Sequence, residues 1–154
     1  METRLFHKIL LPTDGSDASL SAAKYAAEIA ECTSAQVVLL NVAEVSAITQ
    51  FVGYSARGGR HPEIGLREVG EGILDRTKKA LLEAGVPVRT KIVEGFAPET
   101  IIREAEDGNY DLIVMGSHGA EGGALRRVLF GLGSVAESVV SNAPCPVLVV
   151  RGGQ

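Results

Sequence analysis

Short apolar runs alternate with helical patterns along almost the whole chain. The apolar runs occupy residues 9–12, 36–42, 88–93, 112–115 and 147–150, and each predicts a β-strand. Helices are expected over residues 17–32, 63–84, 99–106 and 134–141. Strands that alternate with helices predict a parallel sheet with right-handed crossovers and helices on both faces. The fold class is therefore α/β.

Two segments differ from this regular pattern. Residues 88–93 alternate apolar with polar side chains, which predicts a strand with an exposed face at the edge of the sheet. Residues 43–62 show no period, and we expect a mobile loop there, with a short helical turn near 45–51 as one option. Within the second and fourth helices, the positions expected to face the sheet are Leu66, Val69, Gly70, Ile73, Leu74, Thr77, Leu81, Leu82, Val135, Ala136, Val139 and Val140.

Composition sets limits on the class of protein. The length of 154 residues fits one domain, residues 1–154, with a substantial core. A net charge of −4 gives no indication of a nucleic-acid or anionic-membrane partner. No apolar run approaches the roughly 20 residues of a membrane span, and the N-terminus lacks the apolar segment of a secretory signal. Cys32 and Cys145 are interpreted as buried reduced thiols, and no structural metal is expected. We expect a cytoplasmic protein.

A glycine-rich stretch follows the fourth apolar run. After Met115 come six glycines, and after the last of them Ser134 opens a helical pattern; the glycines are Gly116, Gly119, Gly122, Gly123, Gly131 and Gly133. A strand, a loop that a ligand can approach closely and a helix N-terminus together suit an anion, because free backbone N–H groups and the helix dipole favour negative charge. The leading hypothesis is that this loop holds the phosphates of a nucleotide. The alternative is a long surface connection without a ligand.

The position of this loop in the fold supports the hypothesis. In open parallel sheets, ligands bind beyond the carboxyl ends of the strands, where the strand order reverses. Asp14 follows the first strand and Gly116 the fourth, so both converge on one crevice if these strands are neighbours. No GxxxxGK[ST] motif is present. Residues 131–136 match GxGxxA, but they do not directly follow a strand, and we interpret this match as coincidental.

Several segments together resemble the universal stress proteins of the UspA type. They are residues 9–16 (ILLPTDGS), 40–42 (LNV), 111–119 (DLIVMGSHG), 133–137 (GSVAE) and 143–150 (APCPVLVV). The resemblance implies an open, doubly wound sheet of five parallel strands in the order 3-2-1-4-5. It also implies a homodimer in which the last strands of two copies meet antiparallel.

One branch of that family binds ATP through the pattern G-x2-G-x9-G-[ST]. Gly116 and Gly119 match its first half and Gly133-Ser134 its last pair, although the spacer 120–132 has 13 residues rather than nine. The resemblance implies that Asp14 meets the adenine or ribose and that the other site residues wall the base, border the ribose or hold the phosphates. These are Pro12, Thr13 and Val42 for the base, Met115 and Gly116 for the ribose, and Gly119, Gly133, Ser134 and Val135 for the phosphates.

Structural alternatives exist for these assignments. Asp14 can instead brace the turn before the first helix, and Ser134 can be only the N-cap of the last one. His118 is expected to be solvent-exposed, and Arg126-Arg127 can supply charge to phosphates or form a solvated face.

The predicted function follows from these residues and from the resemblance. It is an ATP-binding regulatory or stress-response dimer, with or without Mg²⁺ and with slow hydrolysis at most. The alternatives are a dimeric interaction protein that recruits a partner through its surface or residues 43–62, and an enzyme that transfers AMP.

Overall fold

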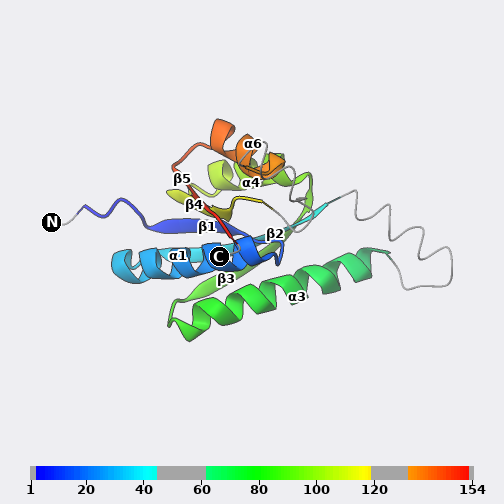
Figure 1. Cartoon of the computed structure of the whole chain (residues 1–154), viewed down its shortest axis with the longest axis horizontal. Coiled ribbons are helices and arrows are strands. Elements are labelled where there is room, and N and C mark those ends of the chain that lie inside the picture. The colour runs from blue at the N-terminus through cyan, green and yellow to red at the C-terminus, as the bar shows by residue number, and fades with distance from the viewer. Residues whose placement is uncertain (1–2, 45–61, 119–131, 153–154) are drawn as a thin grey trace.

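Five parallel strands form the centre of the molecule. A computed structural model describes residues 3–44, 62–118 and 132–152 (Figure 1). The described strands form one sheet in the order β3-β2-β1-β4-β5, all pairs parallel. Their bounds are Lys8–Pro12 (β1), Gln36–Glu44 (β2), Val88–Gly95 (β3), Leu112–Gly116 (β4) and Val147–Val150 (β5). The strand order implied by the family resemblance is confirmed, as is the position of β3 at an edge.

Helices cover both faces of this sheet (Figure 1). One face packs against α1 (Asp17–Thr33) and α3 (Pro62–Glu83), and the other against α4 (Ala97–Asp107) and α6 (Ser134–Asn142). Alternate residues of β1 divide between the two cores, Ile9 and Leu11 on the α1 side and Leu10 on the α4 side. No helix in the described ranges has the length and apolar character needed to cross a bilayer.

Local sequence explains how α1 begins and why it packs closely. Ser16 is the N-cap, and its side chain accepts a hydrogen bond from the Ser19 N–H. The buried stripe of the helix is almost entirely alanine, which lets the helix axis approach the sheet; its members include Ala18, Ala22, Ala23, Ala26, Ala27 and Ala30. The start of α1 is therefore held against the end of β1.

Several sequence expectations need correction. Ala43 and Glu44 belong to β2 rather than to a loop, because they continue the pairing with Glu94 and Gly95 of β3. The remaining loop and the helical turn expected at 45–51 lie outside the described residues. Cys32 is exposed in the last turn of α1, whereas Cys145 is half-buried in the α4–α6 core.

Three residues expected to face the sheet are instead largely exposed. Val69, Leu82 and Val140 are 51%, 54% and 48% exposed. The cause in α3 is geometric. The buried positions of this helix follow one another at intervals of four, three and four residues and fill the centre of the face that packs on the sheet. Val69 and Leu82 each lie one residue outside this series and so fall on the flanks of that face. The buried α3 positions are Gly70, Leu74, Thr77 and Leu81.

Candidate functional site

The ends of β1 and β4 lie side by side. Ile9 pairs with Leu112 and Leu10 with Ile113, so the residues that follow the two strands emerge at the same edge of the sheet. The chain leaves β1 into α1 on one face and reaches α6 on the other face after β4. This is the point where the strand order reverses, which is where open parallel sheets bind ligands. The first and fourth strands are therefore neighbours, which is the condition under which Asp14 and Gly116 were expected to converge.

The turn after β1 is tightly fixed. The Thr13 N–H donates to the Leu40 carbonyl at 2.9 Å and so extends the ladder by one residue beyond Pro12. Asp14 is exposed, and its Oδ1 accepts a hydrogen bond of 2.9 Å from the Ser16 N–H. The bracing role considered for Asp14 is therefore present in the structure, and it orients the exposed carboxylate.

Apolar side chains line the α4 face near this turn. Met115 is buried in the core between the sheet, α4 and α6, and Val42 packs against the same core while half-exposed. Pro12 is buried and, by strand alternation from Leu10, belongs to the same face of the sheet. Three of the residues predicted to wall the base or border the ribose thus lie at the ends of adjacent strands on one face.

Gly116 has a structural reason to be glycine. A Cβ at this position would lie 2.9 Å from both the carbonyl carbon and the Cβ of Ala18, at the start of α1. Such a distance is closer than van der Waals contact allows, and the backbone of a helix cannot easily retreat. Close packing of β4 on α1 therefore accounts for this glycine without a ligand.

Ser117 joins β4 to the start of α6. Its N–H donates to the Val150 carbonyl at 2.8 Å, and its carbonyl accepts the Gly133 N–H at 2.7 Å. Its buried hydroxyl lies 2.6 Å from Nδ1 of His118. His118 is half-buried rather than exposed as expected, and this contact holds its ring beside the Ser117 side chain. Sequence reasoning did not single out Ser117, and its position between two motif residues gave no signal of this role.

The N-terminus of α6 supplies backbone donors. Gly133, not Ser134, is the N-cap, and it makes no side-chain cap hydrogen bond. The N–H of Gly133 is engaged by Ser117, so the donors at the first turn begin with the N–H groups of Ser134 and Val135. Ser134 is exposed and Val135 half-buried. Gly119, Arg126 and Arg127 lie outside the described residues.

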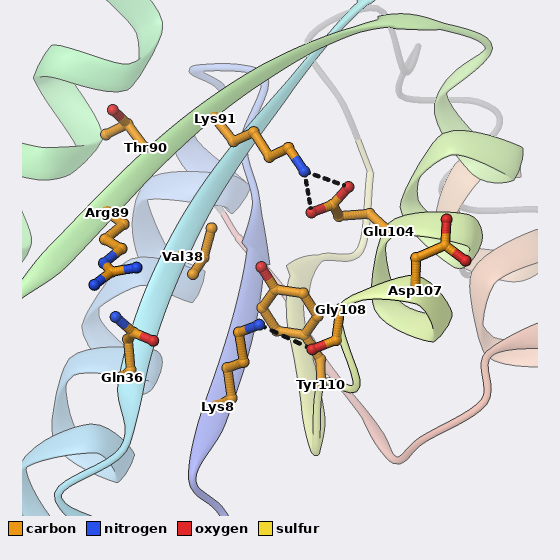
Figure 2. A pocket seen from close by; sticks show the side chains of 10 residues that line it. All are labelled: Lys8, Gln36, Val38, Arg89, Thr90, Lys91, Glu104, Asp107, Gly108 and Tyr110. Carbon is orange, nitrogen blue, oxygen red and sulfur yellow. Dashed lines mark hydrogen bonds and ion pairs between the residues drawn. The ribbon is translucent and has the colours of Figure 1, made fainter.

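A separate cavity of about 420 Å³ lies at the opposite ends of the strands (Figure 2). Its walls are the first residues of β1 and β2, part of β3 and the C-terminal end of α4. Lys91 contacts both carboxylate oxygens of Glu104 at 2.7 and 2.9 Å. Lys8 donates to the Gly108 carbonyl at 2.8 Å and lies 4.4 Å from the centre of the Tyr110 ring. These contacts join β1 and β3 to α4 and the segment after it at the amino ends of the strands, opposite the end at which open parallel sheets bind ligands.

Two titratable groups in the described part have shifted pKa values, and neither belongs to the β1–β4 edge. Burial, with a smaller contribution from Glu104, raises the pKa of Tyr110 to about 12. Burial followed by the charge of Asp111 raises the pKa of the Cys145 thiol, so this thiol has no activated character. Within residues 3–44, 62–118 and 132–152, no group of three or more His, Cys, Asp and Glu side chains could hold a metal ion.

Comparison with known proteins places this arrangement in one family. The universal stress protein family model matches residues 5–151. The universal stress protein MJ0531 of Methanocaldococcus jannaschii is 46% identical over 149 residues, covering 96% of this chain and 83% of its own. MJ0577 of the same organism is 32% identical, with 96% of each chain covered.

Solved structures agree with this result. The structure of MJ0577 superposes with a TM-score of 0.79 at 31% identity and covers 97% of this chain and 99% of its own. The universal stress protein from Archaeoglobus fulgidus in complex with dAMP shares the fold, with a TM-score of 0.69 at 18% identity over 95% of this chain and 98% of its own. The chain therefore belongs to the universal stress protein family.

Proposed function

We propose that this protein binds an adenine nucleotide, ATP in the first place, at the carboxyl ends of β1 and β4. The observation that carries the proposal is the pairing of these two strands, which brings the Asp14 turn and the N-terminus of α6 to one edge of the sheet. The same fold in the Archaeoglobus fulgidus protein holds dAMP, which supports an adenine nucleotide as the ligand class.

The chemistry of each side matches one end of such a ligand. The exposed Asp14 carboxylate accepts hydrogen bonds from ribose hydroxyls or the adenine amine. The half-buried Val42 offers apolar surface for the base, and the buried Pro12 and Met115 lie on the same face of the sheet beside it. The Ser134 hydroxyl and the first-turn N–H groups of α6 donate to phosphate oxygens, and the helix dipole adds to their effect. ATP binds here alone or with Mg²⁺.

The proposal includes slow hydrolysis at most. Asp14 is engaged by the Ser16 N–H and His118 by the Ser117 hydroxyl, so both side chains are already held by protein groups. Orienting a water for attack on the γ-phosphate needs a group held toward that water. Turnover above about 1 s⁻¹, an ordinary enzyme value, would contradict this part of the proposal.

We also propose that the protein acts in the cytoplasm as a regulatory or stress-response homodimer that pairs through β5. The sheet described here has β5 at one edge, with Val147, Leu148 and Val149 half-buried and the largely exposed Val140 on the adjacent helix. An edge strand with apolar side chains is suited to pairing with a second copy.

The decisive experiment uses the purified full chain. Denaturation followed by mass analysis identifies any nucleotide that co-purifies, and calorimetry measures binding of added ATP and AMP with and without Mg²⁺. Co-purified adenine nucleotide, or ATP binding in the micromolar range, is the expected result. A protein that is empty and binds neither nucleotide would overturn the proposal and leave the interaction protein, working through its dimer surface, as the better description.

A further inference from the structure

A buried polar network connects α3 to the turn after β1. Its members are Thr13, Ser19, Asn41 and Thr77, all between 0% and 6% exposed. The hydroxyl of Thr77 donates to the Ile73 carbonyl at 3.1 Å, and that of Ser19 donates to the Ser16 carbonyl at 2.9 Å. Oγ1 of Thr13 donates to Oγ of Ser19 at 3.2 Å and lies 2.9 Å from Oγ1 of Thr77, a contact in which either hydroxyl can be the donor.

Every polar group of Thr13 is fixed by this network. Its N–H donates to Leu40, its carbonyl accepts from Nδ2 of Asn41 at 3.0 Å, and its hydroxyl lies between α1 and α3. The Gly15 N–H also approaches the hydroxyl, at 3.3 Å. Because β2 holds the N–H and carbonyl of Thr13 while α1 and α3 hold its hydroxyl, the direction in which Asp14 leaves the turn is fixed as well.

A glycine in α3 makes room for the network. A Cβ at Gly70 would lie 2.9 Å from Oδ1 of Asn41 and 3.3 Å from Cδ1 of Ile92. Gly70 and Thr77 are seven residues apart, about two helical turns, so both face the sheet. The helix thus meets the network at two points: Thr77 contacts Thr13 directly, and Gly70 leaves space for Asn41.

We infer that Thr77 and Asn41 are positioning residues for the adenosine end of the nucleotide site. They act through Thr13 on Asp14 and touch no ligand themselves; the inference rests on the proposed function. Four hydrogen-bonding residues in a core contribute little net stability over apolar ones of the same shape. What they add is direction, because hydrogen bonds fix the orientation of a turn that apolar contacts would leave free to rotate.

The first test compares three threonine variants by calorimetry, at a temperature where circular dichroism shows each to be folded. Thr77→Val removes the α3 hydroxyl that contacts Thr13, and we expect AMP and ATP to bind about five-fold more weakly, by the same factor, since one hydrogen bond is worth two- to ten-fold. Thr77→Ser keeps the hydroxyl and should restore binding. Thr33→Val is the matched control, because Thr33 makes the same bond to the carbonyl four residues earlier, at 2.7 Å from Ile29, far from the turn.

The outcomes separate the inference from the function it rests on. A parent protein that binds neither AMP nor ATP overturns both. If the parent binds and Thr77→Val binds AMP as well as the parent does, the inference is wrong and the site stands. If Thr77→Val weakened the binding of ATP but not that of AMP, the inference would also be contradicted, because such a difference indicates an effect on the phosphate end of the site. Ser134→Ala serves as the reference variant for an effect at that end. An equal loss in Thr33→Val would show an indirect effect and contradict it too.

A second test leaves every polar atom in place. Gly70→Ala crowds Oδ1 of Asn41, whereas Gly72→Ala, on the same helix, meets nothing within 4 Å. Both changes raise helix propensity equally. We expect Gly70→Ala to weaken AMP binding by about five-fold, as loss of one directing hydrogen bond would, and Gly72→Ala to leave it unchanged. Equal affinities in the two variants would overturn the role of Asn41.

Discussion

Glycine at position 116 is required by a neighbour within the protein. The Ala18 backbone occupies the space that a Cβ would need, at 2.9 Å. We therefore expect Gly116→Ala to lower the free energy of unfolding by about 1–3 kcal/mol through overpacking, whether or not nucleotide is present. Urea unfolding without ligand measures this. An unchanged midpoint would mean that α1 retreats easily, and the glycine would then be better explained by ligand approach.

Tyr110 makes the stability of the fold dependent on pH at the alkaline end. Its pKa is about 12 in the folded protein against 10.0 for an ordinary tyrosine, because burial disfavours the phenolate and Glu104 adds to this. The folded state thus holds the phenolic proton more tightly than the unfolded state does. The contribution of this proton to the free energy of unfolding is fully present below pH 10 and is lost as the pH rises toward 12. Tyr110→Phe should show a shallower fall in unfolding free energy over this range, by up to about 2–3 kcal/mol. Parallel pH curves for the two proteins would contradict the shift.

At the scale of the element, two of the glycines in α3, Gly70 and Gly72, have opposite consequences. Gly72 is exposed and has open space around it, so Gly72→Ala should raise the free energy of unfolding by about 0.5–1 kcal/mol through helix propensity alone. Thermal unfolding followed by circular dichroism measures this, and a lower melting temperature would contradict it. Helix propensity alone treats both glycines alike. Only the packed structure distinguishes Gly70, because its neighbour Asn41 comes from a strand far away in the chain.

Element order was predictable from the sequence because each strand and helix has a local signal. The continuous apolar run of β4 and the Gly85–Pro87 punctuation after α3 are examples. Ala43 and Glu44 had no such signal, since their strand character comes from pairing with β3. The candidate site likewise has residues with a local signal and contacts without one. Asp14 and Gly133-Ser134 stood out by motif, but the bond from the Gly133 N–H to Ser117 depends on the tertiary fold.

At the scale of the whole molecule, the two edges of the described sheet differ. β3 carries Arg89, Thr90 and Lys91, all exposed, and such polar edges resist pairing with another chain. β5 carries only valine and leucine. The apolar edge is also connected to the proposed nucleotide site, because Ser117 bonds to Val150 at the end of β5 and to Gly133 at the start of α6.

The geometry of β5 allows its edge to be changed without disturbing its inner side. The N–H groups of Ile113 in β4 and of Ser117 just after it donate to the carbonyls of Pro146 and Val150, so alternation directs the N–H of Val149 away from β4. Val149→Pro removes that outward donor, and an edge strand tolerates proline at such a position. By light scattering we expect the parent to run as the proposed dimer and the variant as a monomer with an unchanged circular dichroism spectrum. A folded variant that remains dimeric would show that two copies pair through another surface, and the link from Ser117 to β5 would then have no bearing on assembly.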